Sequence, residues 1–433
     1  MVYLLYDIIL FLSALILLPY FGIRSVLQGE KRLGIRQRMG IYPIAQLETL
    51  RGRDVFWVHA VSVGETRAAI PLIKALKKAW PDCALVLSNT TQTGHAIGCD
   101  VDDVDLCLYF PFDHSWVIKR VLRQIAPSLI VIVETELWPN FIRHARRSGI
   151  PVAMVNGRIS DRSFPRYRLF QWFVRPLLQL VSAFCMQSEA DADKVRALGA
   201  AGRRMEVTGN LKFDMQMAVP GGEQVETMKK RFGLPAETAI WVAGSTHAGE
   251  EELVVETYRN LIEEGQRVFL VLAPRHLERC SAVAEMIASR DMSSTMRSDL
   301  ETGRVTFKAG EILLVDTMGE LLNFYALADM VFVGGSLVPV GGHNVLEAAL
   351  VKKPVLFGPY MGNFKEISAL LLDAGGGLRV RDRHELFGMT RQLLQNPQMR
   401  SSMGQKGHAL IREHSGATEK TLEVIRSIVE SDG

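Results

Sequence analysis

The sequence lacks the patterns that mark several common classes of protein. Its five cysteines, Cys83, Cys99, Cys107, Cys185 and Cys280, include no C-x-x-C pair, so their spacing supports neither a disulfide framework nor a zinc site. There is no Walker A lysine motif, and no G-x-G-x-x-G follows the first predicted strand, which weakens ATP-binding and dinucleotide-binding interpretations. A formal net charge of +3 in 433 residues is too small for a dedicated nucleic-acid binder.

Apolar runs of membrane length are also scarce, and the exception opens the chain. Residues 2–21 are almost wholly apolar, close to the ~20 residues that span a bilayer, although Asp7 and Pro19 interrupt them. No positive charge precedes the run and no cleavage site follows it, which argues against a signal peptide. The Lys and Arg residues at 24–38 favour anionic headgroups and place the following chain on the cytoplasmic side. We predict an uncleaved anchor at residues 1–23, spanning the membrane or lying in it; a buried core helix is the alternative.

Beyond this start, short β-branched runs alternate with stretches of helical periodicity, which is typical of parallel sheets covered by helices. The predicted strands are Val55–Val61, Ala84–Leu87, Leu106–Phe110, Leu129–Val133, Val152–Val155, Ala183–Met186 and Met205–Val207, then Ile240–Ala243, Val268–Leu272, Ile312–Val315, Met330–Val333 and Pro354–Phe357. We predict an α/β protein of two Rossmann-like domains with a cleft between them. Their expected bounds are 24–212 and 236–415, with a linker at 213–235 and a last helix at 416–433.

The loops after the second set of strands are rich in glycine, hydroxyl groups and hydrogen-bond donors. They are Gly244–His247, Pro274–His276, Asp316–Glu320, Gly334–Ser336 and Gly341–Glu347. Glycine lets backbone N–H groups approach a phosphate closely, and a following helix presents its positive end to the anion. We therefore predict a nucleotide site here, with Arg275 on a phosphate and Glu347 on the ribose hydroxyls. Alternatively, Glu347 is a first-turn glutamate stabilised by the helix dipole.

The first half ends its strands with carboxylates. Glu65 follows the first predicted strand, and Glu134 and Glu136 follow the fourth. A hydroxyl that attacks a sugar needs a base within hydrogen-bond reach, and Glu65 is the candidate, although it could instead cap its own helix. The role requires that this carboxylate not be buried inside a domain. Lys212 is a fixed cation that could stabilise charge on a leaving phosphate.

Three other features carry weaker signals. His59 stands at a strand end, where a lone histidine is more often structural than substrate-binding. The aspartates at 100, 102, 103 and 105 have the spacing of a solvated loop, so we predict no metal site. Residues 158–175 interleave five arginines with five aromatic residues, which suits a membrane-facing surface or a solvated basic helix with a core-facing aromatic stripe.

Taken together, these motifs resemble those of the 3-deoxy-D-manno-octulosonic acid (Kdo) transferases of lipopolysaccharide assembly, along nearly the whole chain to Gly416. The most specific stretches are Ser62–Thr66, Glu134–Asn140, Gly209–Asp214, Asp316–Leu321 and Gly334–Glu347. The resemblance implies a GT-B fold and an inverting transfer from CMP-Kdo to the lipid A precursor. It also implies action at the cytoplasmic face of the inner membrane, with no nucleic-acid partner.

The resemblance further assigns roles to residues at matching positions. Glu65 matches the general base of the family, and Glu134 and Lys212 match residues that stabilise the transition state. The matched CMP contacts are Pro274, Arg275, Met318, Gly319, Glu320, Asn344, Val345, Leu346 and Glu347. Since CMP leaves with a single phosphate, no cofactor and no protein-bound metal are expected.

Two other functions remain open from the sequence. One is a GT-B transferase that uses a UDP-sugar on another lipid-linked acceptor. The other is a membrane-tethered protein that senses nucleotide without catalysis, for which Glu65 and Lys212 would be dispensable.

Overall fold

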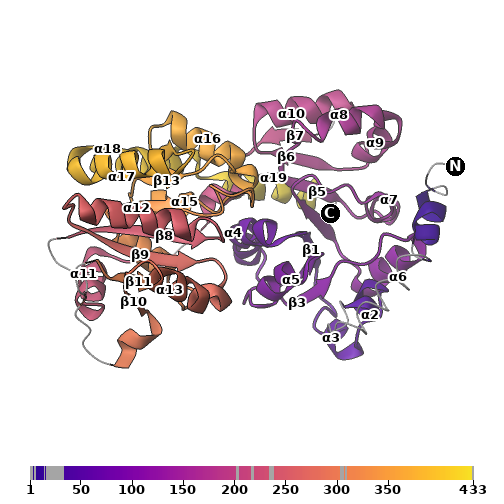
Figure 1. Cartoon of the computed structure of the whole chain (residues 1–433). Helices are drawn as coiled ribbons and strands as arrows, with labels where there is room; N and C mark the ends of the chain where they lie inside the picture. Colours follow the sequence, from indigo (N-terminus) through magenta and orange to yellow (C-terminus); the bar gives the residue numbers. More distant parts are fainter. Residues whose placement is uncertain are drawn as a thin grey trace. The chain divides into compact units, whose positions relative to one another are not determined.

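The protein, as a computed structural model, is described over residues 3, 6–13, 15, 34–200, 204–215, 219–233, 238–302, 307 and 310–431. The chain forms two compact units. The first contains residues 1–216 together with 414–433, and the second contains residues 217–413. Each unit is described by itself below, with the element labels of Figure 1.

The first unit is a seven-stranded parallel sheet in the order β3-β2-β1-β4-β5-β6-β7. Its strands are β1 (Val55–His59), β2 (Ala84–Asn89), β3 (Leu106–Tyr109), β4 (Leu129–Val133), β5 (Val152–Gly157), β6 (Ala183–Met186) and β7 (Arg204–Val207). Its helices are α2 (Ile35–Arg38), α3 (Ile44–Glu48), α4 (Val63–Ala79), α5 (Gln92–Cys99), α6 (Ser115–Ile125), α7 (Pro139–Arg147), α8 (Phe164–Leu169), α9 (Gln171–Leu178), α10 (Glu189–Val195) and α19 (Ala417–Ser431), with short turns η1 (Arg196–Ala200) and η2 (Leu211–Asp214).

The second unit repeats this plan with the order β10-β11-β9-β8-β12-β13-β14, again all parallel. Its strands are β8 (Ala239–Thr246), β9 (Val268–Pro274), β10 (Ser294–Met296), β11 (Ile312–Leu314), β12 (Met330–Val333), β13 (Val355–Phe357) and β14 (Gly377–Arg379). Its helices are α11 (Gly222–Arg231), α12 (Glu251–Glu263), α13 (Cys280–Ala288), α14 (Leu321–Leu327), α15 (Leu346–Leu350), α16 (Lys365–Asp373), α17 (Arg383–Gln395) and α18 (Pro397–His414), with 3-10 turns η3 (Leu277–Arg279), η4 (Ser298–Thr302) and η5 (Gly362–Phe364).

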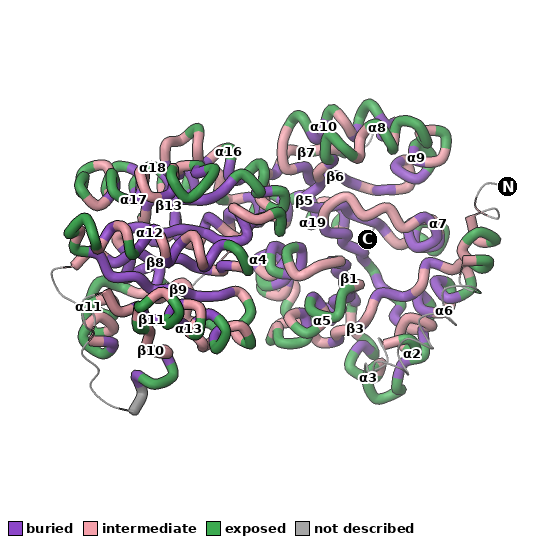
Figure 2. The backbone as a smooth tube through the Cα atoms, viewed as in Figure 1, coloured by how far each residue is buried: buried purple, intermediate pink, exposed green. Residues whose placement is uncertain are grey.

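Helices on both faces explain why the central strands are apolar throughout. Every residue of β1, β4 and β9 is buried, and Figure 2 shows the strands buried while the outer faces of the helices are exposed. Helix α4 illustrates the covering layer: Ser62 caps its start, and Leu72, Ile73 and Leu76 pack against the sheet. The prediction of two parallel α/β domains is confirmed.

The structure differs from the sequence prediction at short elements and boundaries. The prediction missed β10 and β14, which are three-residue strands at the sheet edges. The stretch 213–235, predicted as a linker, contains α11, and Phe232 after it is buried against Phe324 of α14. The last helix, α19, joins the first unit, because its Val424, Ile425 and Ile428 pack into the core beside α4.

The predicted anchor at residues 1–23 lies largely outside the described residues. Residues 6–13 are helical, and Asp7 accepts hydrogen bonds from the Asn140 side chain at 2.6 Å and the Ser115 amide at 3.2 Å. Within the part of the chain that the structure describes, no helix has both the length and the apolar character that a bilayer crossing requires.

Candidate functional site

In the first sheet, two acidic residues named from the sequence fall at the point where ligands commonly bind. In open parallel sheets that point lies beyond the carboxyl ends of the strands where the strand order reverses. In the first sheet the reversal lies between β1 and β4. Glu65 follows β1 and Glu134 follows β4, so the fold places both carboxylates at this position.

Glu65 lies in the first turn of α4 and folds back over the helix start. Its Oε2 accepts the Val61 amide at 2.8 Å and its Oε1 accepts the Ser62 hydroxyl at 2.8 Å, so it does cap its own helix. The expectation that this carboxylate is not buried inside a domain is wrong, because only 8% of the residue is exposed. A substrate hydroxyl could reach the carboxylate only through this small exposed fraction. A carboxylate offers about four lone-pair positions, so two hydrogen bonds leave capacity for a substrate hydroxyl.

The environment of Glu65 raises the pKa of its carboxyl group, although helix capping by itself would lower it. Burial raises the pKa of the Glu65 carboxyl, and the charge of Glu134 raises it further. The hydrogen bonds from Val61 and Ser62 and the charge of Lys212 act in the opposite direction. The net pKa is above the ordinary value, which makes this carboxylate a stronger base than an exposed capping glutamate.

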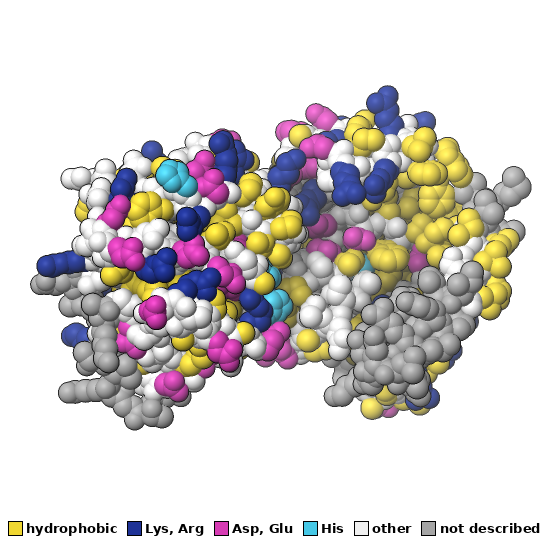
Figure 3. Space-filling model, viewed as in Figure 1, with side chains coloured by type: hydrophobic (Ala, Val, Ile, Leu, Met, Phe, Trp, Pro, Cys, Tyr) yellow, Lys and Arg dark blue, Asp and Glu magenta, His cyan; other side chains and the backbone are white. Residues whose placement is uncertain are grey.

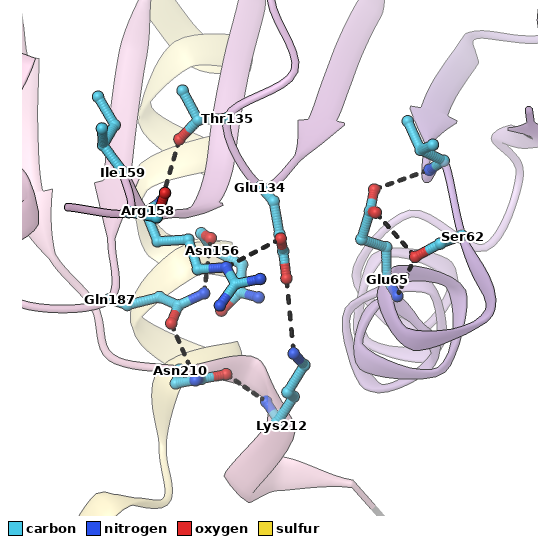
Figure 4. Close-up of polar contacts among 12 residues, drawn as sticks. Ser62, Glu65, Glu134, Thr135, Asn156, Arg158, Ile159, Gln187, Asn210 and Lys212 are labelled. Carbon is cyan, nitrogen blue, oxygen red and sulfur yellow. Dashed lines mark hydrogen bonds and ion pairs between the residues drawn. The ribbon is translucent and has the colours of Figure 1, made fainter. Parts of the chain in front are cut away.

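Glu134 directly follows β4 in a left-handed backbone conformation, with φ 61°. This conformation is strained for a residue with a side chain and is common at functional sites. Its carboxylate accepts the Arg158 Nε–H at 3.0 Å and pairs with Lys212 Nζ at 3.6 Å. Figure 4 shows Glu134 and Lys212 pointing toward one another, with Glu65 across from them on α4.

A chain of amide side chains fixes Lys212. The Asn210 side chain accepts the Lys212 amide at 3.0 Å and donates to Gln187 at 2.9 Å. Gln187 donates to the carbonyl of Asn156, whose side chain accepts the Leu211 amide at 3.0 Å (Figure 4). These hydrogen bonds fix the backbone of the turn η2, which carries the Lys212 ammonium group.

Glu136 is a third acidic residue of this site. Burial raises the pKa of Glu136 to about 7, and the charges of Glu65 and Glu134 contribute to the rise. Glu136 therefore holds a proton up to near neutral pH, because it is desolvated and lies near two other carboxylates.

His59 is a structural residue. It is fully buried, stacks on Phe110 with ring centroids 3.9 Å apart, and its Nδ1 contacts the Ser88 hydroxyl at 3.0 Å. Burial lowers the pKa of His59 to about 3, so it stays neutral.

In the second unit, the predicted CMP contacts lie on loops at the carboxyl ends of β9, β11 and β12. Pro274 ends β9, and the Arg275 amide donates to the Thr246 carbonyl at 2.9 Å. Met318 is exposed, Gly319 has φ 82°, and Glu320 binds Arg297 at 2.8 Å and the Thr317 hydroxyl. Asn344 accepts the Leu346 amide at 3.1 Å and donates to Glu347 at 3.3 Å, while Val345 and Leu346 are buried.

The glycine loop after β12 departs from the sequence interpretation. Its amides were expected to be available for a phosphate, but the fully buried carboxylate of Glu250 accepts three of them, from Gly335, Ser336 and Leu337, at 2.6 to 2.9 Å. It also accepts the His247 amide at 3.0 Å. Glycine at 334 is required sterically, because a Cβ there would lie 2.5 Å from the Ser245 carbonyl oxygen. These N–H groups therefore fix the loop.

Two histidine side chains lie beside Gly335 in the loop after β12. His247 and His343 stack with ring centroids 5.1 Å apart and share a hydrogen bond of 2.8 Å between their Nε2 atoms. Burial lowers the pKa of His247, and the nearby His276 and Arg275 add to this effect.

The first unit also exposes a group of large apolar side chains. Its members are Ile8, Ile9, Phe11, Leu12, Leu15, Trp116, Leu169, Phe170 and Trp172, each at least 47% exposed, and we call this group the apolar surface. Figure 3 shows hydrophobic side chains gathered on this unit, where α9 and the N-terminal residues lie. Tyr6 and Phe173 connect these segments, with ring centroids 6.0 Å apart. Arg158 is not part of this surface. It binds Glu134 in the group formed by Glu65, Glu134, Glu136 and Lys212, which we call the carboxylate site.

The sequence analysis missed Arg158 and Asn156 as site residues, and Glu250 in the second unit. Asn156 gave a faint signal, because an asparagine at the end of a buried strand tolerates the positive φ of 54° that it has here. Glu250 gave none, since the three loop amides that it accepts lie more than 80 residues away in the chain.

Comparison with known proteins shows which family the sequence resembles and which solved structures share its fold. The family model described as 3-deoxy-D-manno-octulosonic-acid transferase matches residues 33–215. The chain is 30% identical over 427 residues to the 3-deoxy-D-manno-octulosonic acid transferase of Haemophilus influenzae, covering 98% of both chains. It is 33% identical to that of Bordetella pertussis over 382 residues, covering 85% of this chain and 86% of the relative. The S. aureus MnaA–UDP co-structure is similar in fold, with a TM-score of 0.59 at 14% identity, over 87% of this chain and 97% of MnaA.

Proposed function

This chain belongs to the 3-deoxy-D-manno-octulosonic acid (Kdo) transferase family, and on that premise we propose that it transfers Kdo from CMP-Kdo to a hydroxyl of a lipid A precursor, with inversion. The observation that carries the proposal is the carboxylate site, in which Glu65 and Glu134 follow the two strands at the reversal of the sheet and Lys212 pairs with Glu134 at 3.6 Å. A candidate base, a second carboxylate and a fixed cation, each following the carboxyl end of a strand, suit sugar transfer to an alcohol.

In the proposed reaction Glu65 removes the proton from the acceptor hydroxyl. The hydroxyl oxygen forms a bond to the anomeric carbon of Kdo while the bond from that carbon to the CMP phosphate breaks, and CMP departs with the electron pair. The raised pKa of Glu65 suits it to this step. Lys212 and Arg158, which already contact Glu134, supply positive charge near a carboxylate-bearing sugar.

We assign donor binding to the second unit, through the side chains and loops at Pro274, Arg275, 318–320 and 344–347. Because Glu250 accepts the amides of residues 335–337, the positive charge for the phosphate has to come from elsewhere in these loops. Arg275 is the side chain we assign to it. CMP leaves with one phosphate, so the proposed reaction needs no protein-bound metal.

We assign acceptor delivery to the apolar surface of the first unit. A lipid acceptor sits in a membrane, and exposed tryptophan, phenylalanine and leucine side chains favour the headgroup boundary. Arg166 and Arg168 lie in the last turn of α8, next in sequence to the exposed Leu169 and Phe170. Their positive charges attract anionic lipids. This arrangement supports action at the cytoplasmic face of the inner membrane, with residues 1–23 as the anchor.

A donor panel tests the proposal. The purified full-length chain is incubated with a lipid A precursor and CMP-Kdo, UDP-glucose or UDP-N-acetylglucosamine, and the products are weighed by mass spectrometry. We expect one or more Kdo additions with CMP-Kdo and no addition with the UDP-sugars. Transfer from a UDP-sugar, with none from CMP-Kdo, would overturn the assignment of the donor.

A further inference from the structure

A cluster of metal-ligating side chains lies in the first unit, outside the carboxylate site. His95, Cys99 and Cys107 present one ligand atom each, and these atoms lie within 4.8 Å of one another. The Nδ1 atom of His95 is 3.4 Å from the sulfur of Cys107 and 3.9 Å from the sulfur of Cys99. All three cysteine and histidine side chains are at least partly accessible, so an ion can reach them from solvent.

These separations match the edges of a tetrahedral zinc site. With Zn–S bonds of about 2.3 Å and Zn–N bonds of about 2.0–2.1 Å, tetrahedral geometry puts ligand sulfur and nitrogen atoms ~3.5 Å apart. The observed nitrogen-to-sulfur distances of 3.4 and 3.9 Å lie on either side of this value. The three ligand atoms therefore lie near the separations that a single tetrahedral ion requires.

The local structure fixes the ligands in place. His95 and Cys99 are four residues apart on α5 and so project from one face of the helix, and Cys107 lies on β3, whose alternate residues face α5. The imidazole of His95 stacks on Tyr109 of the same strand, with ring centroids 3.9 Å apart. Spacing along the chain gave no hint of this site, because the third ligand comes from the following strand.

We propose that His95, Cys99 and Cys107 bind one Zn²⁺ ion, with the fourth coordination position open to water or an external ligand. Two thiolates and an imidazole are a donor set that zinc prefers over magnesium or calcium. The ion joins the carboxyl end of α5 to β3. Since α5 also packs on the start of α4, where a Cβ on Gly94 would lie 3.2 Å from the Ser62 carbonyl carbon, the site stabilises the helix that begins beside Glu65. The inference is independent of the donor and acceptor proposed above.

The test measures metal binding by the reduced, full-length protein after removal of metal. Titration with Zn²⁺ is followed by calorimetry, and Co²⁺ is used as a spectroscopic probe, because thiolate ligands in a tetrahedral site give intense visible and charge-transfer absorption. We expect one equivalent of each ion to bind. Cys99→Ser and Cys107→Ser should each weaken Zn²⁺ binding by about 100-fold and lower the thiolate absorption of bound Co²⁺, because each removes one of two thiolates and leaves the other.

The matched control is Cys280→Ser. Cys280 is buried and lies outside the cluster, and its thiol donates to the Val315 carbonyl at 3.7 Å. This variant should bind Zn²⁺ and Co²⁺ as the unmodified protein does. Because Cys99 is exposed, Cys99→Ser should keep its fold, and an unchanged circular dichroism spectrum verifies this.

The proposal would be overturned if the protein did not bind Zn²⁺ at micromolar concentration. It would also be overturned if the double variant with Cys99→Ser and Cys107→Ser still bound one equivalent, or if Cys280→Ser were the variant that lost binding. Peptide mapping that finds a Cys99–Cys107 disulfide in protein that was never exposed to oxidant would also overturn it, and would identify a redox pair instead.

Discussion

The two units share one architecture, yet they use acidic residues at their strand ends in opposite ways. In the first unit Glu65, Glu134 and Glu136 lie together, and the pKa values of Glu65 and Glu136 are raised. In the second unit Glu250 lies fully buried and accepts four backbone N–H groups. The first arrangement leaves carboxylates able to exchange protons, whereas the second uses a carboxylate to hold a loop. The same fold thus groups carboxylates with raised pKa values in one unit and fixes a loop with a buried carboxylate in the other.

The largest expected effect is the loss of the base. Glu65→Gln keeps the size of the side chain and an acceptor for the Val61 amide, but it cannot accept the proton of the acceptor hydroxyl. We expect kcat for Kdo transfer to fall by about 10²–10⁴-fold, while the Kd for CMP, measured by calorimetry, stays within about twofold.

Glu189→Gln is the matched control, because Glu189 occupies the first turn of α10 in the same unit and is exposed. It should leave kcat unchanged. Near-normal turnover of Glu65→Gln, together with an inactive Glu136→Gln, would transfer the role of base to Glu136.

The next effect concerns the loop of the second unit. Glu250→Gln replaces one carboxylate oxygen by an NH₂ group that faces backbone donors, and buried donors without a partner cost about 1–3 kcal/mol each. We expect amide hydrogen exchange at Gly335, Ser336 and Leu337 to accelerate by about 30-fold, equivalent to about 2 kcal/mol, and CMP affinity to fall.

Glu252→Gln provides the comparison for that measurement. Glu252 accepts the Gly249 amide at 3.1 Å and is not buried, so its change should leave exchange at residues 335–337 as it was. Unaltered exchange in Glu250→Gln would show that the loop does not depend on this carboxylate.

A smaller effect appears in the pH dependence of stability. The folded-state pKa of Glu136 is about 7, above the ordinary value of 4.5, so the folded protein binds this proton more tightly than the unfolded chain does. The free energy of unfolding should therefore decrease as pH rises from about 4.5 to about 7. Glu136→Gln cannot ionise, so its Tm should exceed that of the unmodified protein by several degrees at pH 8 but not at pH 4.5. A Tm difference that does not change with pH would show that Glu136 titrates normally.

The smallest expected effect concerns a second difference between the units, which is the apolar surface of the first unit. Leu169→Ser with Trp172→Ser removes two side chains that are 73% and 61% exposed, so the fold should tolerate both changes. We expect binding to vesicles that contain anionic lipid to weaken by about tenfold, or about 1.4 kcal/mol. Full burial of such a side chain contributes about 1.5–3 kcal/mol, and the headgroup boundary buries each of the two only in part. Met318→Ser, an exposed apolar residue of the second unit, should leave vesicle binding unchanged.

Hydrophobic pattern was sufficient to predict the sheets. The strands Leu129–Val133, Ala183–Met186 and Met330–Val333 were predicted to the residue, because buried parallel strands are continuous apolar runs. Strands β10 and β14 were missed because three residues at a sheet edge carry too little apolar sequence to be distinguished from loops. The longer strands could therefore be predicted from the sequence, whereas the short edge strands could not.

The candidate site was only partly readable. Strand ends led to Glu65, Glu134 and Lys212, since parallel strands bring their carboxyl ends to one edge. The left-handed backbone of Glu134 and its bond to Arg158 depend on β5 lying beside β4, which no local pattern specifies. The binding of three loop amides by Glu250 likewise depends on the pairing of β8 with β12.

The packing of α19 beside α4 determines the order in which the molecule can be completed during synthesis. A ribosome releases residues 1–216 before residues 217–413, but Val424, Ile425 and Ile428, which cover part of the first unit, emerge only after both. The intervening residues 217–413 can finish folding while the earlier segment still presents an uncovered apolar face. A stalled or truncated chain that ends before residue 417 would thus hold a finished second unit and an incomplete first one, and it would be a ready substrate for chaperones and proteases.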